Sequence, residues 1–100
     1  EMGWDAQWEE SGASAVERYR NEGPFDVTLV DYMMPDLNGG HTIRAIRAVD
    51  PAARFVLISG LSPEEMVEVD FDDPALVFLP KPFALAQLES ALARIVPQSA

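Results

Sequence analysis

Three polar side chains follow apolar runs of the sequence: Asp31, Ser59 and Lys81. A carboxylate can attack a phosphoryl group and form an acyl phosphate. A lysine ammonium can pair with phosphoryl oxygens, and a serine hydroxyl can donate a hydrogen bond to one of them. Phosphoryl transfer depends on positioning and on charge neutralisation, in which Mg²⁺ bound by oxygen ligands usually takes part. These residue types predict phosphoryl chemistry, provided that the fold brings them together.

Segments with the patterns of strands and helices alternate along the chain. The expected strands are 4–9, 27–30, 55–58 and 76–79, and the expected helices are 13–22, 41–49, 66–71 and 85–95. Strands separated by helices predict a single α/β domain, a doubly wound parallel sheet with helices on both faces. In such a sheet the carboxyl ends of the strands share one rim, where functional side chains gather. Asp31, Ser59 and Lys81 are all expected at that rim.

Side-chain patterns predict which faces are buried. Trp4, Ala6 and Trp8 alternate with polar residues, which is typical of a half-buried strand with both tryptophans packed on the sheet. Residues 62–65 form a capping box with proline at the first helical position, and they predict the start of the short acidic helix. The last helix carries an apolar stripe at helical spacing, which predicts its core face. The stripe consists of Leu85, Leu88, Leu92 and Ile95.

Composition excludes several classes of function. The chain has 100 residues, enough for one domain, and its 17 acidic and 7 basic residues give a net charge of −10. A surface of this charge repels phosphate backbones, so we expect no direct binding to nucleic acid. The chain has no cysteine, which excludes thiolate chemistry and agrees with a cytoplasmic location. No apolar run approaches the ~18 residues of a membrane span, so we expect no membrane contact.

Three motifs give the chain a resemblance to a known family. Residues 30–39 read V-D-Y-M-M-P-D-L-N-G, residues 56–60 read V-L-I-S-G, and residues 78–83 read F-L-P-K-P-F. At this spacing, between these expected strands, they resemble the receiver domain of two-component response regulators. The resemblance runs along residues 1–100 and implies a flavodoxin-like fold. It also implies a signalling domain that accepts a phosphoryl group from a histidine kinase and hydrolyses the acyl phosphate slowly, rather than an enzyme.

The resemblance assigns roles to individual residues. Asp31 matches the phospho-acceptor aspartate, and Ser59 and Lys81 match the hydroxyl and the lysine that contact the phosphoryl group. The family's bond between this lysine and the following proline is usually cis. Asp31 and the backbone carbonyl of Met33 match positions that bind Mg²⁺, and Phe78 matches the aromatic position whose rotamer reports the state of the site.

The chain departs from the family at its beginning. Family members start with a strand that ends in two metal-binding acidic residues, followed by a first helix, and the chain has no counterpart of either. We therefore expect an N-terminally incomplete receiver with four of the usual five strands, unpaired edges on the missing strand's neighbours, and weak or absent Mg²⁺ binding. The missing strand would belong to a longer protein or come from another chain. Glu9 and Glu10 are an alternative source of metal-binding carboxylates.

Two further readings of function stay open at this stage. A receiver-like interaction domain that is never phosphorylated would share the fold, and two adjacent acidic residues upstream would argue against it. A hydrolase or phosphatase is disfavoured, since no second aspartate follows Asp31 at two residues' distance and His41 is expected on a solvated helix face. The expected partner is a histidine kinase or a phosphotransfer domain. The output, homodimer formation, and the choice between a stand-alone regulator and a hybrid-kinase receiver stay open.

Overall fold

The computed structural model describes residues 6–9, 11–33, 38–66 and 69–95. The strands in this part of the chain are β1 (Ala6–Trp8), β2 (Val27–Asp31), β3 (Phe55–Ser59) and β4 (Leu76–Pro80). The helices are α1 (Gly12–Glu22), α2 (Gly39–Val49) and α3 (Leu85–Ile95), with one 3₁₀ turn, η1 (Pro63–Glu65). No helix among these residues is both long and apolar enough to cross a membrane.

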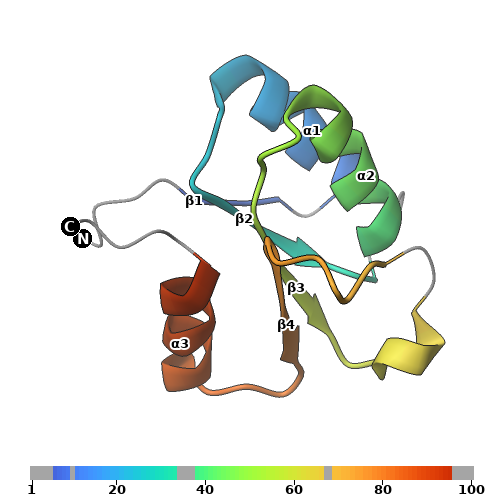
Figure 1. Ribbon diagram of the computed structural model, residues 1–100, viewed down its shortest axis with the longest axis vertical. Coiled ribbons are helices and arrows are strands. Elements are labelled where there is room, and N and C mark those ends of the chain that lie inside the picture. The colour runs from blue at the N-terminus through green and yellow to red at the C-terminus, as the bar shows by residue number, and fades with distance from the viewer. Residues whose placement is uncertain (1–5, 10, 34–37, 67–68, 96–100) are drawn as a thin grey trace.

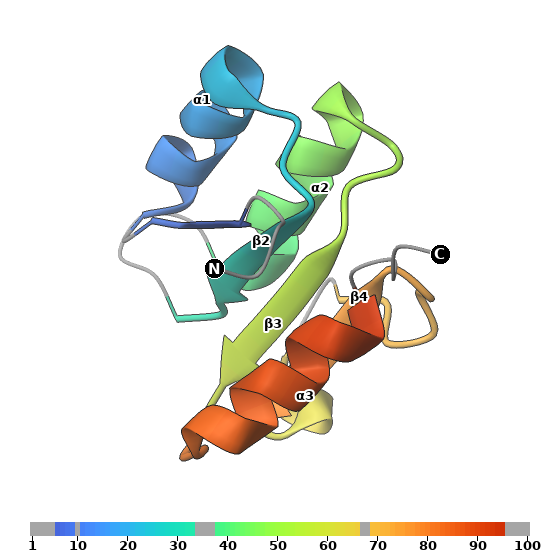
Figure 2. The ribbon, with the colours of Figure 1, turned by 90° about the vertical axis from the view of Figure 1, so that its left-hand side faces the viewer.

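The strands form one parallel sheet in the order β1-β2-β3-β4. Helices α1 and α2 cover one face and α3 covers the other, as Figures 1 and 2 show from two directions. The doubly wound architecture expected from the sequence is therefore confirmed.

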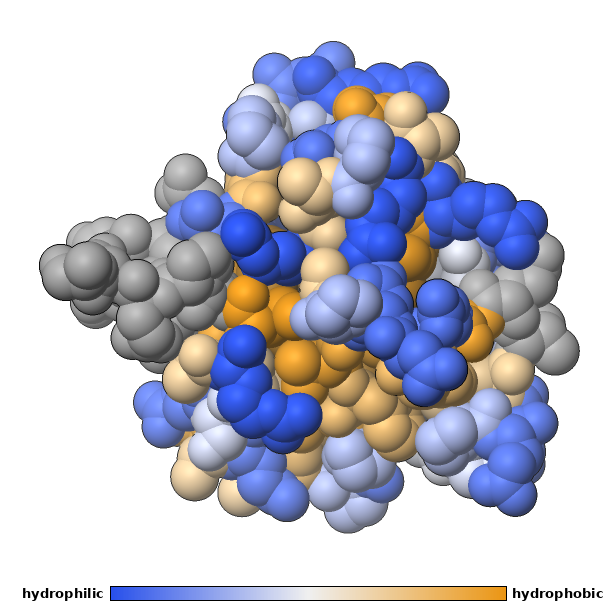
Figure 3. All heavy atoms as spheres, in the orientation of Figure 1, coloured by the Kyte–Doolittle hydropathy of each residue, from blue (hydrophilic) through white to orange (hydrophobic). Residues whose placement is uncertain are grey.

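Two apolar clusters fill the space between the sheet and its helices. Along β3, Phe55 and Leu57 join the cluster beneath α1 and α2, whereas Val56 and Ile58 join the cluster beneath α3. This alternation gives each face of the strand a helical layer, which explains why the strand is apolar at successive positions. In the space-filling view, apolar residues gather at the middle of the visible face and hydrophilic residues surround them (Figure 3).

The expected unpaired edges beside a missing strand are not found, and that expectation was wrong. Strand β1 pairs directly with β2 in parallel, with Ala6 opposite Val27 and Trp8 opposite Leu29. Direct pairing satisfies backbone N–H and C=O groups that an open gap would leave without partners, and such groups are costly to bury. The backbone of β1 is thereby joined to the rest of the sheet.

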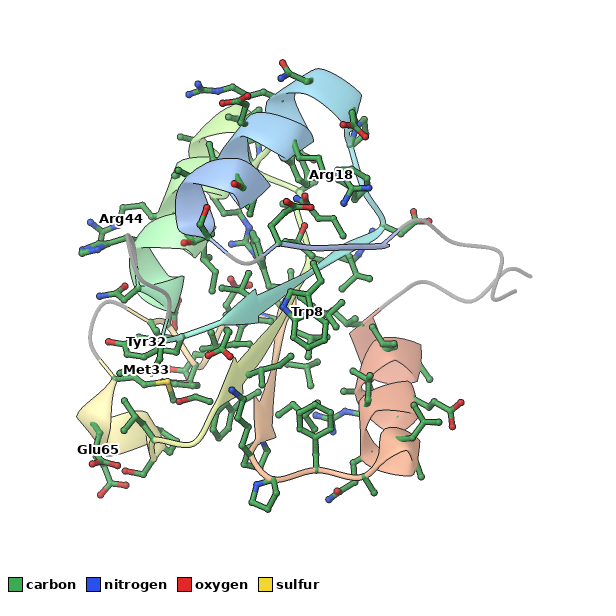
Figure 4. The ribbon with its side chains drawn as sticks, turned by 180° about the vertical axis from the view of Figure 1, so that it is seen from behind. Trp8, Arg18, Tyr32, Met33, Arg44 and Glu65 are labelled. Atoms are coloured by element: carbon green, nitrogen blue, oxygen red, sulfur yellow. The ribbon has the colours of Figure 1, made fainter. Side chains whose placement is uncertain are left out.

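The burial expected for the first strand is reversed at Gln7 and Trp8. Gln7 is 2% exposed, and its side-chain amide donates to the Ala15 carbonyl at 3.2 Å and to the Thr28 hydroxyl at 3.3 Å. Trp8 is 53% exposed and points from β1 away from α1 (Figure 4). It lies on the face where α3 packs on β3 and β4 rather than on β1. Trp4 lies outside the described residues.

The expected acidic helix over 66–71 is wrong in the part that the structure describes. The capping box is present, and the Glu65 carboxylate accepts from the Ser62 N–H at 2.9 Å, but only the 3₁₀ turn η1 follows. Met66 is already extended, with φ −93° and ψ 138°. Further on, the Asp70 carboxylate accepts from the N–H of Asp72 at 3.0 Å. Aspartates that bond to nearby backbone in this way favour turns over helix.

The ends of two helices also differ from the expected ones. Helix α2 begins at Gly39, two residues earlier than expected, because the Asn38 side chain caps it by accepting from the His41 N–H at 2.9 Å. In α3, Leu92 and Ile95 are buried as expected, but Leu85 is 69% exposed. Leu85 is the first residue of α3.

Candidate functional site

The fold brings the ends of β2, β3 and β4 together at one rim. Asp31 lies opposite Ile58 in the β2–β3 ladder, and Ser59 lies opposite Pro80 in the β3–β4 ladder. The Lys81 N–H then donates to the Ser59 carbonyl at 2.8 Å, which fixes the start of the loop after β4. Backbone pairing alone therefore places Asp31, Ser59 and Lys81 side by side.

The Lys81 ammonium contacts the Asp31 carboxylate directly, with 2.6 Å between Nζ and Oδ2. The other carboxylate oxygen, Oδ1, accepts from the Met33 N–H at 3.0 Å. The Asp31 side chain is 21% exposed and the Lys81 side chain 45%, so an incoming group can reach both from solvent. The arrangement holds a nucleophilic carboxylate beside a positive charge that can compensate new negative charge.

Ser59 is buried at the same rim. Its hydroxyl oxygen accepts from the Leu61 N–H at 2.9 Å. A serine hydroxyl that accepts one hydrogen bond still has its own hydrogen to donate. Ser59 can therefore keep its turn contact or rotate toward a group bound at Asp31.

The residues around Lys81 agree with two further expectations. The Lys81–Pro82 peptide bond is cis, as the resemblance implied. Phe78 is half-buried in β4, and its ring packs edge-on against the ring of Phe71. The sequence patterns did not identify Phe71 as a neighbour of the site. The one feature that could have drawn attention to it is its place as an aromatic residue in the acidic segment, residues 69–73.

Among the residues that the structure describes, few acidic side chains lie near this rim to bind a divalent cation. The resemblance names the Asp31 carboxylate and the Met33 backbone carbonyl as donors, and among the described residues no group of three or more acidic or histidine side chains is placed to hold a metal. Glu9 does not supply the missing carboxylate, because it pairs with Arg18 at 2.8 Å on α1. Glu10 lies outside the described residues. The donor types suit Mg²⁺, but two protein oxygens are a small part of its six ligands.

The remaining sequence candidates have side chains that face solvent. His41 is exposed in the first turn of α2, as expected for a solvated face. Met33 is exposed, and Figure 4 shows it on the same side of the molecule as Tyr32 and Glu65.

A parallel α/β domain with a carboxylate, a hydroxyl and a lysine on one rim has the form of a phospho-acceptor signalling domain. The response regulator receiver domain family matches residues 1–93. The chain is 32% identical over 85 residues to the chemotaxis protein CheY of Thermotoga maritima, an alignment that covers 85% of this chain and 70% of that protein. The chain therefore belongs to the response regulator receiver domain family and is a phospho-acceptor domain of two-component signalling.

Solved structures agree with this assignment. The CheX–CheY–BeF₃–Mg²⁺ complex from Borrelia burgdorferi superposes with a TM-score of 0.75 at 29% identity, covering 85% of this chain and 64% of that one. The receiver domain of the sensor histidine kinase PA1611 from Pseudomonas aeruginosa has a TM-score of 0.75 at 25% identity, covering 93% and 77%. That receiver has a magnesium ion coordinated in its active-site cleft. The flavodoxin-like receiver fold is thus confirmed.

Proposed function

We propose that Asp31 accepts a phosphoryl group from a phosphohistidine of a histidine kinase or a phosphotransfer domain. A carboxylate oxygen attacks phosphorus, the bond from phosphorus to the histidine nitrogen breaks, and its electron pair remains on the imidazole. The product is an acyl phosphate on Asp31. The observation that carries the proposal is the 2.6 Å contact between Lys81 and the Asp31 carboxylate.

Lys81 and Ser59 have separate roles in this proposal. The Lys81 ammonium turns from the carboxylate to the phosphoryl oxygens, so that the added charge of about −1.5 to −2 is partly neutralised. The Ser59 hydroxyl donates to another phosphoryl oxygen, which draws it away from the Leu61 N–H that it now accepts from at 2.9 Å. Phe78, in the neighbouring strand, then repacks and changes the surface that a partner meets.

Mg²⁺ would be held by the Asp31 carboxylate and the Met33 carbonyl, with water completing the coordination. When bound, it supplies additional positive charge for the transferred group. Two protein oxygens predict weak binding, because Mg²⁺ dehydrates reluctantly and favours carboxylates. A calorimetric titration with MgCl₂ should show a lower affinity than a titration of a receiver with three acidic ligands; equal affinity would implicate another carboxylate, with Glu10 as the first candidate.

The partners and the place of action follow from the same chemistry. A kinase or phosphotransfer domain that carries phosphohistidine must approach the rim at Asp31, which is open to solvent. We place this exchange in the cytoplasm, in keeping with a chain that contains no cysteine. The net charge of −10 favours protein partners over direct contact with nucleic acid.

The test is phosphorylation with acetyl phosphate and Mg²⁺, followed by intact-mass analysis and by stability of the label to acid and base. One acid-stable, base-labile phosphoryl group is expected on the wild-type chain, and Asp31→Asn should abolish it. Asp72→Asn, which changes an exposed aspartate in the acidic segment, is the matched control and should label normally. Undiminished labelling of Asp31→Asn would overturn the assignment, and an unlabelled wild-type chain would favour a receiver that only binds partners.

A further inference from the structure

Phe71 is an aromatic residue in the acidic segment before β4, and it touches the proposed switch residue. Its ring meets the ring of Phe78 edge-on, with 5.8 Å between centroids and 83° between planes. This is a favourable geometry for an aromatic pair. Phe71 is itself 36% exposed, so the pair sits at the surface of the molecule rather than in its core.

The segment that carries Phe71 is fastened to α2. Arg47 pairs with Asp73 at 2.7 Å, and both side chains are mostly buried. The Arg47 guanidinium also donates through Nε to the Ala53 carbonyl at 2.9 Å and lies 5.1 Å from the centre of the Phe55 ring. These contacts restrict the Arg47 side chain. Its ion pair therefore restricts Asp73, which lies two residues after Phe71 in the sequence.

Local turns set the path of the chain between Phe71 and β4. The Asp73 N–H donates to the Asp70 carbonyl at 3.3 Å, and the Asp73 carboxylate accepts from the Ala75 N–H at 2.9 Å. Ala75 is in turn joined to β3, because its carbonyl accepts from the Phe55 N–H at 2.9 Å. These contacts join the segment on both sides to α2 and β3, and they therefore fix the position of Phe71 against Phe78.

We propose that Phe71 is a positioning residue for the Phe78 switch, holding its ring in the unphosphorylated arrangement. A phenylalanine has no hydroxyl that would hold it outward in water, so without a partner its ring would turn toward the interior. Phe71 gives it an apolar partner on the outside. The inference rests on the proposed function, in which the phosphoryl group on Asp31 draws Ser59 inward and Phe78 follows.

The energetic consequence is a shift in a two-state equilibrium. A contact made only in the unphosphorylated state favours that state, and its removal raises the population of the other. An edge-on aromatic pair has a strength that corresponds to a change of about two- to tenfold in the equilibrium. Losing Phe71 should therefore leave the fold intact and make the unphosphorylated protein resemble the phosphorylated one.

Fluorine NMR on the full chain labelled with 4-fluorophenylalanine can measure this shift. The chain has five phenylalanines, so five resonances are expected, and Phe78→Leu identifies the one from Phe78. Phosphorylating the wild-type chain defines the second end point. In unphosphorylated Phe71→Leu, and more so in Phe71→Ala, the Phe78 resonance should move toward the phosphorylated position. Asp73→Asn should move it in the same direction by releasing the segment from Arg47.

Phe25→Leu is the matched control. Phe25 packs on the cluster beneath α1 and α2, as Phe78 does, and like Phe71 it makes an edge-on pair, with Tyr19 at 5.7 Å and 66°. Its loss should leave the Phe78 resonance in place. If the wild-type chain is phosphorylated but Phe71→Leu and Phe71→Ala leave Phe78 unmoved, or move it away from the phosphorylated position, this inference fails while the proposed function stands. If the wild-type chain is not phosphorylated at Asp31, both fail together.

Discussion

At the scale of single residues, the site depends on one positively charged side chain, that of Lys81. Lys81 is the only lysine of the chain, and its ammonium is 2.6 Å from Asp31. The pair is partly exposed, so its contribution to stability is small. Its importance lies in placing positive charge where the phosphoryl group will add negative charge.

Lys81→Gln should therefore impair chemistry more than folding. We expect labelling of Asp31 by acetyl phosphate to slow by at least about tenfold, because one charged donor to the transferred group is lost. The thermal unfolding midpoint should change little. Lys81→Arg keeps the charge and serves as the control. Wild-type labelling rates in Lys81→Gln would show that the contact has no part in the transfer.

Tyr19 and Asp50 form another short polar contact, away from the rim. The buried Tyr19 hydroxyl donates to the Asp50 carboxylate at 2.5 Å. This hydrogen bond is the main reason that the pKa of Asp50 lies below its usual range, with the Ala52 N–H adding to it. Burial, followed by the same hydrogen bond, raises the pKa of Tyr19. The contact joins α1 to the end of α2, and it is strongest while Asp50 is ionised and Tyr19 is neutral.

Tyr19→Phe should lower stability at neutral pH by about 1–2 kcal/mol, as expected for loss of a hydrogen bond to a charged group. A lowered folded-state pKa contributes stability that is present above the ordinary aspartate pKa and is lost as pH falls through the lowered one. The wild-type and variant curves, measured by urea unfolding, should therefore converge in acid. In an Asp50→Ala background the substitution should cost much less. A difference that persists undiminished in acid would assign the effect to packing.

The polar rim was the part of the site that residue types could predict. An aspartate, a serine and a lysine after successive apolar strands must share a rim in a parallel sheet, and the structure brings Asp31 and Lys81 into contact there. Their chemical roles stay proposals. Phe71 could not be predicted, because its partner Phe78 comes from another element and the pairing depends on how the acidic segment turns.

At the scale of elements, Gly39 controls how α2 joins the sheet. Its N–H donates to the Tyr32 carbonyl at 2.9 Å. A Cβ at this position would lie 2.8 Å from a methyl carbon of Leu57 and 2.9 Å from the Tyr32 Cα. The second contact is with backbone, which has little freedom to move next to Asp31. Only glycine lets the helix begin this close to the end of β2.

Gly39→Ala should therefore destabilise the fold by about 1–3 kcal/mol, the usual cost of overpacking. Because Tyr32 adjoins Asp31, phosphorylation should also slow. Gly60→Ala is a matched control, since a Cβ there would meet nothing within 4 Å. Chemical unfolding measures the free energy of unfolding of both variants. If Gly39→Ala is as stable as Gly60→Ala, the backbone near Tyr32 accommodates the added Cβ without strain.

The errors of sequence-based prediction at this scale have a common cause. The capping box at Ser62 and Glu65 correctly marked a helix start, but local signals did not reveal that Asp70 and Asp73 would form turns instead. In β1, alternation identified the strand yet misplaced its buried side, because Gln7 found partners in α1 and β2. Contacts with other parts of the fold decided both outcomes, and the local sequence pattern does not reveal those contacts.

At the scale of the whole molecule, the parallel direction of the strands was predictable and the pairing at the edge of the sheet was not. Alternating strands and helices require parallel neighbours, which β2, β3 and β4 obey. The direct pairing of β1 with β2 follows from satisfying backbone groups, a requirement that does not depend on residue type. Family resemblance suggested a gap between these strands, whereas the structure closes it.

Net charge is the property that acts on the molecule as a whole. The chain has seventeen acidic and seven basic residues, so ion pairs such as Arg47–Asp73 and Lys81–Asp31 still leave ten negative charges in excess. A net charge of −10 repels itself in the compact state more than in the extended one. Salt screens this repulsion over about 10 Å at 0.1 M.

Raising NaCl from low millimolar concentrations to about 0.2 M should therefore stabilise the protein, by an amount of order 1 kcal/mol. The sign is informative, because a fold held mainly by surface ion pairs would be weakened by the same salt. Sodium is the right cation, since Mg²⁺ would also act at Asp31. Neutralising two exposed acidic residues, in the double variant Glu64→Gln and Asp72→Asn, should reduce the dependence on salt. An unfolding midpoint that falls as NaCl rises would show that attractive pairs, rather than the excess of negative charge, dominate the electrostatics of this domain.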